Sequence, residues 1–317
     1  MPTIDREPRT WWDERWPEQT MTRCIACGFE PFFYVAEREC PHLCLTCADA
    51  ASRHPAWLAH TAGLAQDQGP RQVQADAAAS YRDPTTGRQA FAVADGIGDD
   101  YDPADGAHLT VWAAAAAATT ASAPGGLHIA RECWHRRYDP APPGQKGNAV
   151  AVVAVPVDAD HGGGYDIAWC GDARAYAYTD GDLTQLTTDH TEAELMRAKG
   201  MPAEWIGPRA ENTVTASIGY GVIASVRALA PVGRLLLCTD GVYRKLTPAA
   251  IARALRTFTD PHEATRRLVR AARRRGSTDN ATALVIDPPQ PRHATPETIT
   301  RRPSDPGHTA SDSGVRS

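Results

Sequence analysis

Residues 91–98 read FAVADGIG, a short apolar run that ends in Asp95-Gly96. A run of this length, bounded by aspartate and glycine, is typical of a buried β-strand. The pattern returns where residues 234–239 (RLLLCT) lead into Asp240-Gly241. Glycine lets the backbone turn sharply after the aspartate, so a carboxylate and a carbonyl oxygen can reach a common point. The two dipeptides therefore predict acidic groups at strand ends.

A third carboxylate, Asp279, stands just before the apolar run 282–286 (TALVI). Carboxylate, carbonyl and water oxygens are the ligands that Mg2+ and Mn2+ prefer, and two such ions about 3.5–4 Å apart can clamp an in-line displacement at phosphorus. Any single Asp-Gly is more often a plain turn. The order and context of the three carboxylates favour a cation site over three unrelated turns.

Further short apolar or alternating runs predict additional strands, and Ala-rich or Arg-rich amphipathic runs predict helices. The predicted strands are 147–157, 165–170 and 173–178, and the predicted helices are 109–123, 127–137, 249–258 and 262–276. Blocks of strands separated by paired helices indicate an α+β layered domain. The Arg-rich run 266–275 favours a solvated helix face over a nucleic-acid patch.

Composition narrows the function classes. The chain has 33 Lys and Arg against 38 Asp and Glu, a formal charge of −5, which argues against a protein that coats nucleic acid. No apolar run is long enough to cross a bilayer, so we expect no membrane partner. The charged, Trp-rich start is unlike a secretory signal, so we expect a cytoplasmic protein.

Five of the eight cysteines lie between Cys24 and Cys47. In a reducing cytoplasm such clustering indicates a metal rather than disulfides. Two CxxC pairs predict one structural zinc ion, held by Cys24, Cys27, Cys44 and Cys47. Replacement of one ligand by Cys40 or His42, and fortuitously reduced cysteines, are the alternatives. Zinc binding contributes about 10–16 kcal/mol, enough to fold a segment with little core.

These patterns divide the chain into four parts. We expect a zinc-binding Cys-rich module at 1–60, a linker at 61–70 that ends in Gly-Pro, one folded domain at 71–287, and a disordered tail at 288–317. The tail is rich in Pro, Ser and Thr and has almost no large apolar residues, so it cannot bury enough surface to order itself. The ligands of the module do not reveal whether it binds a protein or a nucleic acid.

Six stretches resemble, in the same order, motifs of the metal-dependent protein phosphatases, the PPM or type 2C Ser/Thr phosphatases. The resemblance spans about residues 71–287 and is closest to bacterial members. The stretches are 71–77 (RQVQADA), 93–98 (VADGIG), 168–176 (AWCGDARAY), 185–191 (QLTTDHT), 235–246 (LLLCTDGVYRKL) and 276–282 (GSTDNAT).

The resemblance implies an αββα four-layer sandwich, in which two antiparallel sheets lie between helix pairs, with a site for two Mn2+ or Mg2+ ions. By motif, Asp95 would bridge both ions, the Gly96 carbonyl would bind the second, and Asp240 and Asp279 would hold the first. Asp76 would belong to the same metal site and would orient metal-bound water. Arg71 would grip the substrate phosphate, since a guanidinium forms strong bonds with phosphate oxygens.

The implied function is hydrolysis of phosphoserine or phosphothreonine in proteins by an activated water, without a covalent intermediate. The implied partners are phosphorylated proteins, the substrates of a Ser/Thr kinase, and a protein bound by the zinc module. Ala75 departs from the family, which often has Glu or Gln there, and this puts occupancy of the second ion in doubt. It motivates the alternative of a catalytically weak scaffold that binds phosphoproteins.

Two further features lie near the fourth of these stretches. Residues 191–215 look like the mobile flap of the family. His190 follows Asp189 in a strand-to-loop turn, where histidine is more often structural than catalytic.

Overall fold

The computed structural model describes residues 60–98, 101–139, 146–158, 163–228 and 231–288. The predicted zinc ligands Cys24, Cys27, Cys44 and Cys47, their alternatives Cys40 and His42, and the predicted tail from 289 onward lie outside the described residues. The zinc ion, the module and the tail therefore stay predictions from the sequence.

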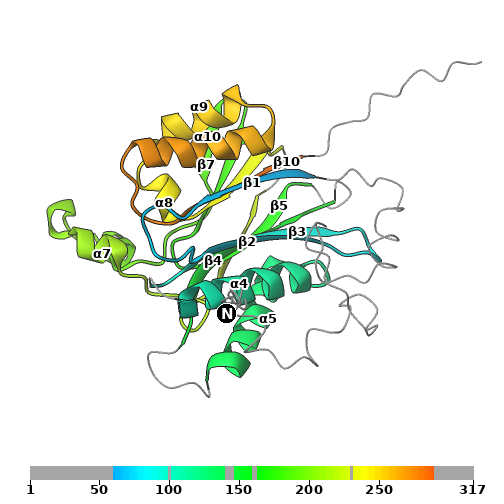
Figure 1. Cartoon of the computed structure of the whole chain (residues 1–317), viewed down its shortest axis with the longest axis horizontal. Helices are drawn as coiled ribbons and strands as arrows, with labels where there is room; N and C mark the ends of the chain where they lie inside the picture. Colours follow the sequence, from blue (N-terminus) through cyan, green and yellow to red (C-terminus); the bar gives the residue numbers. More distant parts are fainter. Residues whose placement is uncertain (1–59, 99–100, 140–145, 159–162, 229–230, 289–317) are drawn as a thin grey trace, which may run out of the picture.

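Two antiparallel sheets of five strands each form the centre of the domain (Figure 1). Sheet A has the order β1-β10-β9-β6-β7, and sheet B has the order β2-β3-β4-β5-β8. The strands of sheet A are β1 (Thr61–Asp67), β10 (Ala281–Asp287), β9 (Arg234–Cys238), β6 (Arg174–Thr179) and β7 (Asp182–Gln185). Those of sheet B are β2 (Asp76–Arg82), β3 (Gln89–Gly96), β4 (Ala149–Pro156), β5 (Tyr165–Cys170) and β8 (Ala224–Ala228).

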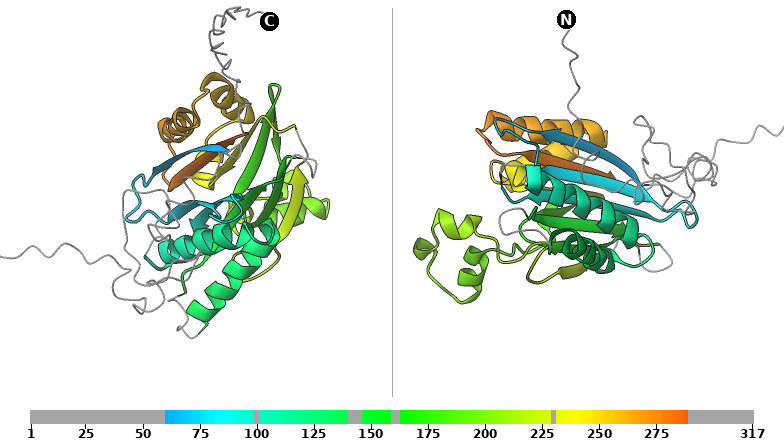
Figure 2. Two further views of the ribbon diagram at one scale, coloured as in Figure 1. Left: turned by 90° about the vertical axis from the view of Figure 1, so that its right-hand side faces the viewer. Right: turned by 60° about the horizontal axis from the view of Figure 1, so that its bottom comes forward.

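Helix pairs cover the outer faces of both sheets (Figures 1 and 2). Helices α4 (Tyr101–Ala118) and α5 (Ala123–Tyr138) pack on sheet B, whereas α9 (Pro248–Thr257) and α10 (Pro261–Arg274) pack on sheet A. A third apolar cluster fills the space between the sheets. This arrangement confirms the predicted α+β class and the αββα sandwich.

Strand β3 shows why its sequence reads as a continuous apolar run. Ala92 and Ala94 belong to the cluster beneath α4 and α5, while Phe91 and Val93 belong to the cluster between the sheets. Both faces of the strand are buried, so neither face selects polar residues. The run therefore ends only where the strand leaves the core, at Asp95.

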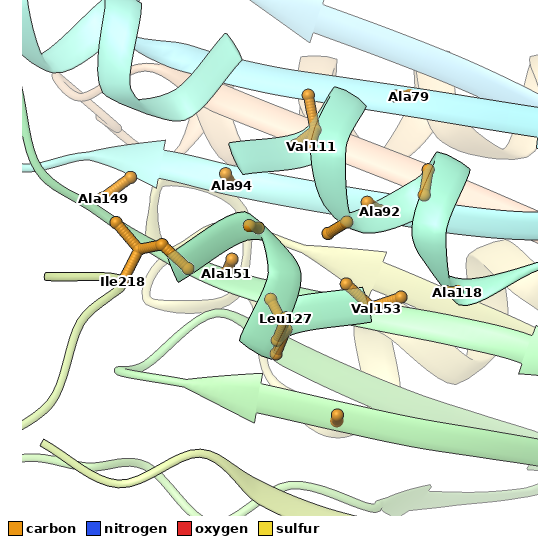
Figure 3. Close-up of a cluster of buried hydrophobic side chains, with 14 of the residues drawn as sticks. Ala79, Ala92, Ala94, Val111, Ala118, Leu127, Ala149, Ala151, Val153 and Ile218 are labelled. Atoms are coloured by element: carbon orange, nitrogen blue, oxygen red, sulfur yellow. The ribbon is translucent and has the colours of Figure 1, made fainter. Parts of the chain in front are cut away.

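Small residues set the distance between sheet B and its helices. Figure 3 shows Ala92, Ala94 and Ala151 of the sheet beneath Val111 of α4 and Leu127 of α5. These side chains are fully buried. An interior packed this densely leaves little room for larger groups, which explains the buried alanines of α4, Ala114, Ala115 and Ala118.

The predicted linker at 61–70 is wrong, because residues 61–67 form strand β1 of sheet A. The strand pairs with β10 along its whole length, from Thr61 opposite Asp287 to Asp67 opposite Ala281. A Cβ on Gly63 would lie 2.2 Å from the backbone of His262, so this glycine allows α10 to approach. The folded domain thus begins before residue 71.

Residues 191–215, here called the flap, stand off from one end of the sandwich (Figure 2). They contain helix α6 (Glu192–Ala198), the short 3-10 helix η2 (Ala203–Trp205) and helix α7 (Pro208–Asn212). A bridge between Thr191 and Val214 closes the base of the flap. The side chains of Leu195 and Trp205 are 51% and 65% exposed.

Among the described helices, none combines the length and the apolar character needed to cross a membrane.

Candidate active site

Strands β2 and β3 bring two acidic side chains together at one end of sheet B. Asp76, the first residue of β2, lies directly opposite Asp95 near the end of β3. Asp76 is buried, with 1% of its surface exposed, whereas Asp95 is half-buried. The Gly96 N–H donates to the Ala75 carbonyl over 3.1 Å, which fixes the backbone beside both carboxylates. Antiparallel register therefore pairs two residues that the sequence separates.

Sheet A contributes Asp240, the first residue of the short helix α8 (Asp240–Tyr243) that follows β9. Thr239, one residue earlier, donates from Oγ1 to Asp76 Oδ2 over 2.9 Å. The Thr239 Oγ1 also accepts from the Thr282 N–H over 3.0 Å. Thr239 thus ties the end of β9 to β10 and, across the gap between the sheets, to Asp76.

The loop before β10 contributes Asp279, which pairs with Arg71. The Arg71 Nη2 lies 2.9 Å from Asp279 Oδ2. The next residue, Asn280, fixes the loop that carries Arg71: its Nδ2 donates to the Val73 carbonyl over 3.0 Å, and its Oδ1 accepts from the Ala75 N–H over 2.8 Å. The structure therefore places all five predicted side chains, Arg71, Asp76, Asp95, Asp240 and Asp279, around the strand ends at one end of the sandwich.

The carboxylates are crowded enough to disturb one another's ionisation. Burial raises the pKa of Asp76 to about 7 against the hydrogen bonds from Thr282 and Thr239, and the charges of Asp240 and Asp279 add to the rise. Burial likewise raises the pKa of Asp240 to about 7, although the nearby Arg244 opposes the shift. The pKa of Asp95 is also raised, first by burial and then by the charge of Asp76. Each direction indicates negative charge that lacks full compensation.

Two oxygens at this end have no hydrogen-bond partner among the described residues, Oδ1 of Asp76 and Oδ1 of Asp240. Leaving a buried carboxylate oxygen unpaired costs free energy, so such atoms are suited to a ligand. The donor set consists of carboxylate and carbonyl oxygens, the type that Mg2+ and Mn2+ prefer. The residues present therefore fit divalent cations.

A preformed cage is not part of this fit. Within the described ranges, no three His, Cys, Asp or Glu side chains form a group that could hold a metal by themselves. Mg2+ commonly keeps several waters and binds through one or two carboxylates, so one or two of these aspartates are sufficient for it.

The glycines of the two Asp-Gly dipeptides serve a different purpose from the one that the sequence predicts. Neither Gly96 nor Gly241 has a positive φ. A Cβ on Gly96 would lie 2.6 Å from the Pro103 carbonyl oxygen, and one on Gly241 would lie 1.9 Å from the Asn280 carbonyl oxygen. Close approach of neighbouring segments, rather than a sharp turn, requires glycine at both positions.

Sequence reasoning missed two residues of this end, Asp172 and Arg244. Asp172 is buried, burial raises its pKa, and it accepts from the Tyr243 hydroxyl over 3.2 Å. Arg244 contacts both Asp172, at 3.0 Å, and Asp240, at 2.9 Å. Both residues lie inside the stretches that carry the resemblance, Asp172 in 168–176 and Arg244 in 235–246. Their position within these stretches was the signal that could have identified them.

His190 has structural contacts. Its ring Nδ1 accepts from the Gly171 N–H over 3.2 Å, and the backbone N–H of His190 donates to the Gly171 carbonyl over 2.9 Å. The ring stacks on Trp169, with the ring centroids 5.9 Å apart. Burial lowers the pKa of His190, which favours the neutral ring that this acceptor role needs. These contacts support a structural role at the base of the flap.

Comparisons with known proteins point to one kind of enzyme. No family model matches the chain. The Ser/Thr protein phosphatase PstP of Mycobacterium tuberculosis is 33% identical over 122 residues, which are 37% of this chain and 24% of PstP. The chain thus matches about a quarter of the length of that curated relative.

Solved structures extend the likeness to the whole described domain. The PPM Ser-Thr phosphatase MsPP of Mycobacterium smegmatis has a TM-score of 0.60 at 27% identity, over 72% of this chain and 97% of MsPP. The catalytic domain of PstP, solved with two manganese ions, has a TM-score of 0.57 at 23% identity, over 72% of this chain and 97% of that one. The described domain therefore has the fold of PPM phosphatases, and the relatives that it matches are Ser/Thr protein phosphatases.

Proposed function

We propose that this chain is a metal-dependent Ser/Thr protein phosphatase of the PPM type, which hydrolyses phosphoserine and phosphothreonine in proteins. One observation carries the proposal: Asp76, Asp95, Asp240 and Asp279 come together from β2, β3, α8 and the loop before β10, beside Arg71. The unpaired Oδ1 atoms of Asp76 and Asp240 support it, because they require a cationic or hydrogen-bonding ligand.

In this mechanism Asp95 and the Gly96 carbonyl would hold the ions together with Asp240 and Asp279. Two divalent ions held there would supply an activated water for in-line attack on phosphorus and would neutralise charge on the phosphate. Asp76 would orient the attacking water through its free Oδ1, since Thr239 already occupies Oδ2. No protein nucleophile is needed, so no covalent intermediate forms.

Arg71 would bind the phosphate of the substrate. Its side chain is 32% exposed, so a phosphate can reach it from solvent, and the 2.9 Å contact with Asp279 fixes the guanidinium beside the metal ligands. A guanidinium presents a planar fork of donors that matches phosphate oxygens. The arginine would orient the substrate for attack and stabilise the charge of the transition state.

Hydrolysis of p-nitrophenyl phosphate and of a phosphothreonine peptide with added Mn2+ tests this function. We expect Mn2+-dependent hydrolysis, and a loss of kcat/KM on the order of 100-fold or more in Asp95→Ala and Asp240→Ala, as when one electrostatic group is removed from an active site. Asp182→Ala, an exposed aspartate on β7, is the matched control and should keep full activity. Equal background rates in the wild type and both site variants would contradict the proposal.

The alternative is a catalytically weak scaffold that binds phosphoproteins, motivated by Ala75. Ala75 is 2% exposed and contributes its backbone N–H and carbonyl to the loop that carries the site. Its methyl group cannot replace a carboxylate or amide ligand at the second ion. Phosphopeptide binding without hydrolysis would favour this alternative.

The remaining parts of the proposal rest on the sequence alone. They are the structural zinc held by Cys24, Cys27, Cys44 and Cys47, recruitment of a protein partner through this module, a place in signalling opposite a Ser/Thr kinase, and the cytoplasmic location.

A further inference from the structure

Arg244, at the end of α8, makes three polar contacts that join separate parts of the chain. Its Nε lies 2.9 Å from Asp240 Oδ2, and its Nη2 lies 3.0 Å from Asp172 Oδ2. The same Nη2 donates to the Glu211 carbonyl over 3.1 Å. Asp240 is a proposed metal ligand, Asp172 follows β5, and Glu211 belongs to α7 of the flap. One guanidinium therefore connects the metal site, sheet B and the flap.

The contact with Asp240 determines which carboxylate oxygen is available. Arg244 engages Oδ2, and Oδ1 has no hydrogen-bond partner among the described residues. The side chain of Asp240 is 19% exposed and that of Arg244 is 31% exposed, so solvent reaches part of the pair. Arg244 thus holds the carboxylate in an orientation that leaves one oxygen for a cation.

The contact with Asp172 fixes the guanidinium itself. The Asp172 side chain is only 8% exposed, and it also accepts from the Tyr243 hydroxyl. A buried carboxylate needs a cationic or donor partner, so this residue holds Arg244 firmly. The planar fork of the guanidinium can then point one nitrogen at Asp240 and another at α7.

The contact with Glu211 satisfies a carbonyl near the C-terminal end of α7. Such carbonyls lack partners within their own helix, and a cation is favoured there. The Glu211 side chain pairs with Arg197 of α6, so a displacement of Glu211 affects both α6 and α7 of the flap. Arg244 is therefore positioned to transmit movement between the flap and Asp240.

We infer that Arg244 is a positioning residue that couples the flap to the metal site, because it holds Asp240 and the Glu211 carbonyl with one guanidinium. The inference rests on the proposed function for the identity of the ion at Asp240. By linkage, metal binding that fixes Asp240 stabilises the flap in the position where Arg244 contacts the Glu211 carbonyl. A flap held in this position strengthens metal binding by the same factor.

Hydrogen exchange of residues 191–215 in the full chain, with and without Mn2+, tests the coupling. In the wild type we expect Mn2+ to slow exchange in α7. In Arg244→Gln we expect exchange in α7 about ten-fold faster after metal removal, the effect of losing a charge-assisted hydrogen bond, and no further slowing by Mn2+. The Mn2+ dissociation constant, measured by calorimetry, should rise about ten-fold, as when a group that orients a ligand is removed.

Two variants separate this role from general stabilisation. Arg244→Lys keeps the charge without the fork, so it should recover part of the Mn2+ affinity but not the protection of α7. If Arg244→Gln does not fold, Arg244→Lys carries the test. Arg256→Gln, an exposed arginine on α9, is the matched control and should behave as the wild type.

Each further outcome decides one question. Unchanged flap exchange and Mn2+ response in Arg244→Gln would overturn the coupling, as would faster exchange spread evenly over the domain. These measurements need no substrate. A wild type that shows the Mn2+ response but hydrolyses no phosphopeptide would overturn the proposed function and leave the coupling intact.

Discussion

Asp76 and Asp240 each need a compensating positive charge, because both are buried and other carboxylates lie near them. Arg244 offsets part of the charge of Asp240, and Thr239 donates to Asp76, yet the pKa of both groups is raised to about 7. The arrangement of these carboxylates therefore depends on single partners, such as Arg244 beside Asp240.

The burial of these two carboxylates, together with the charges near them, predicts a dependence of stability on pH after removal of metal with a chelator. Between about pH 4 and pH 7 the folded state keeps protons on Asp76 and Asp240 that the unfolded state has lost, so the free energy of unfolding falls as the pH rises. In Asp240→Asn one of these groups is absent. The wild type should therefore lose stability relative to Asp240→Asn over this range, on the order of 5 °C in Tm.

Thermal unfolding followed by circular dichroism at several pH values measures this difference, and added Mn2+ should reverse the loss in the wild type. Exposed Asp182→Asn serves as the control, with no pH-dependent difference from the wild type. A wild type that gains stability relative to Asp240→Asn as the pH rises would contradict the expected direction.

Two elements approach one another closely where the site is built. Helix α8 starts against the backbone before β10, and there Gly241 leaves no space for a side chain beside the Asn280 carbonyl. Asp240 and Asp279 are the direct sequence neighbours of these two residues. The spacing of α8 and β10 thus sets the distance between two proposed metal ligands.

Gly241→Ala should disturb stability and metal binding together. The added methyl group would lie 1.9 Å from the Asn280 carbonyl oxygen, so the backbone must shift. We expect a loss of about 1–3 kcal/mol, as for overpacking elsewhere, together with weaker Mn2+ binding. Urea unfolding and calorimetry measure the two effects. Gly207→Ala is the matched control, because a Cβ there meets no atom within 4 Å; equal effects of both variants would refute the packing argument.

The whole domain depends on β1, which forms the edge of sheet A next to β10. Without β1, the hydrogen-bonding groups of β10 would face solvent or another chain, and exposed strand edges promote aggregation. Strand β1 also supports α10, since Gly63 lies against the backbone of Pro261 and His262. The domain therefore begins with a strand that the sequence pattern did not predict.

Two fragments test this boundary. Residues 60–288 retain every strand of sheet A and should give a cooperative unfolding transition, whereas residues 71–288 lack β1 and should be unfolded or aggregated. Circular dichroism and size-exclusion chromatography distinguish the two results. A soluble, cooperatively folding 71–288 fragment would show that β1 is dispensable.

Much of the site follows from local sequence. Asp95 and Asp240 end buried apolar runs, and such runs predict strands whatever their neighbours are. Strand β1 was missed for the opposite reason: its residues TAGLAQD contain three small residues and three polar ones, and only one position is buried. An edge strand with so few buried residues has no clear apolar period, and only pairing with β10 defines it.

The sequence alone determined the strand ends, the acidic residues placed on them and the α+β class, because these depend on neighbours a few residues apart. Only the tertiary structure decided that Asp76 faces Asp95, that Thr239 binds Asp76, and that Arg244 reaches α7. Those contacts join residues separated by long stretches of chain. Their partners are chosen by sheet register and by the packing of the two sheets, which no local pattern encodes.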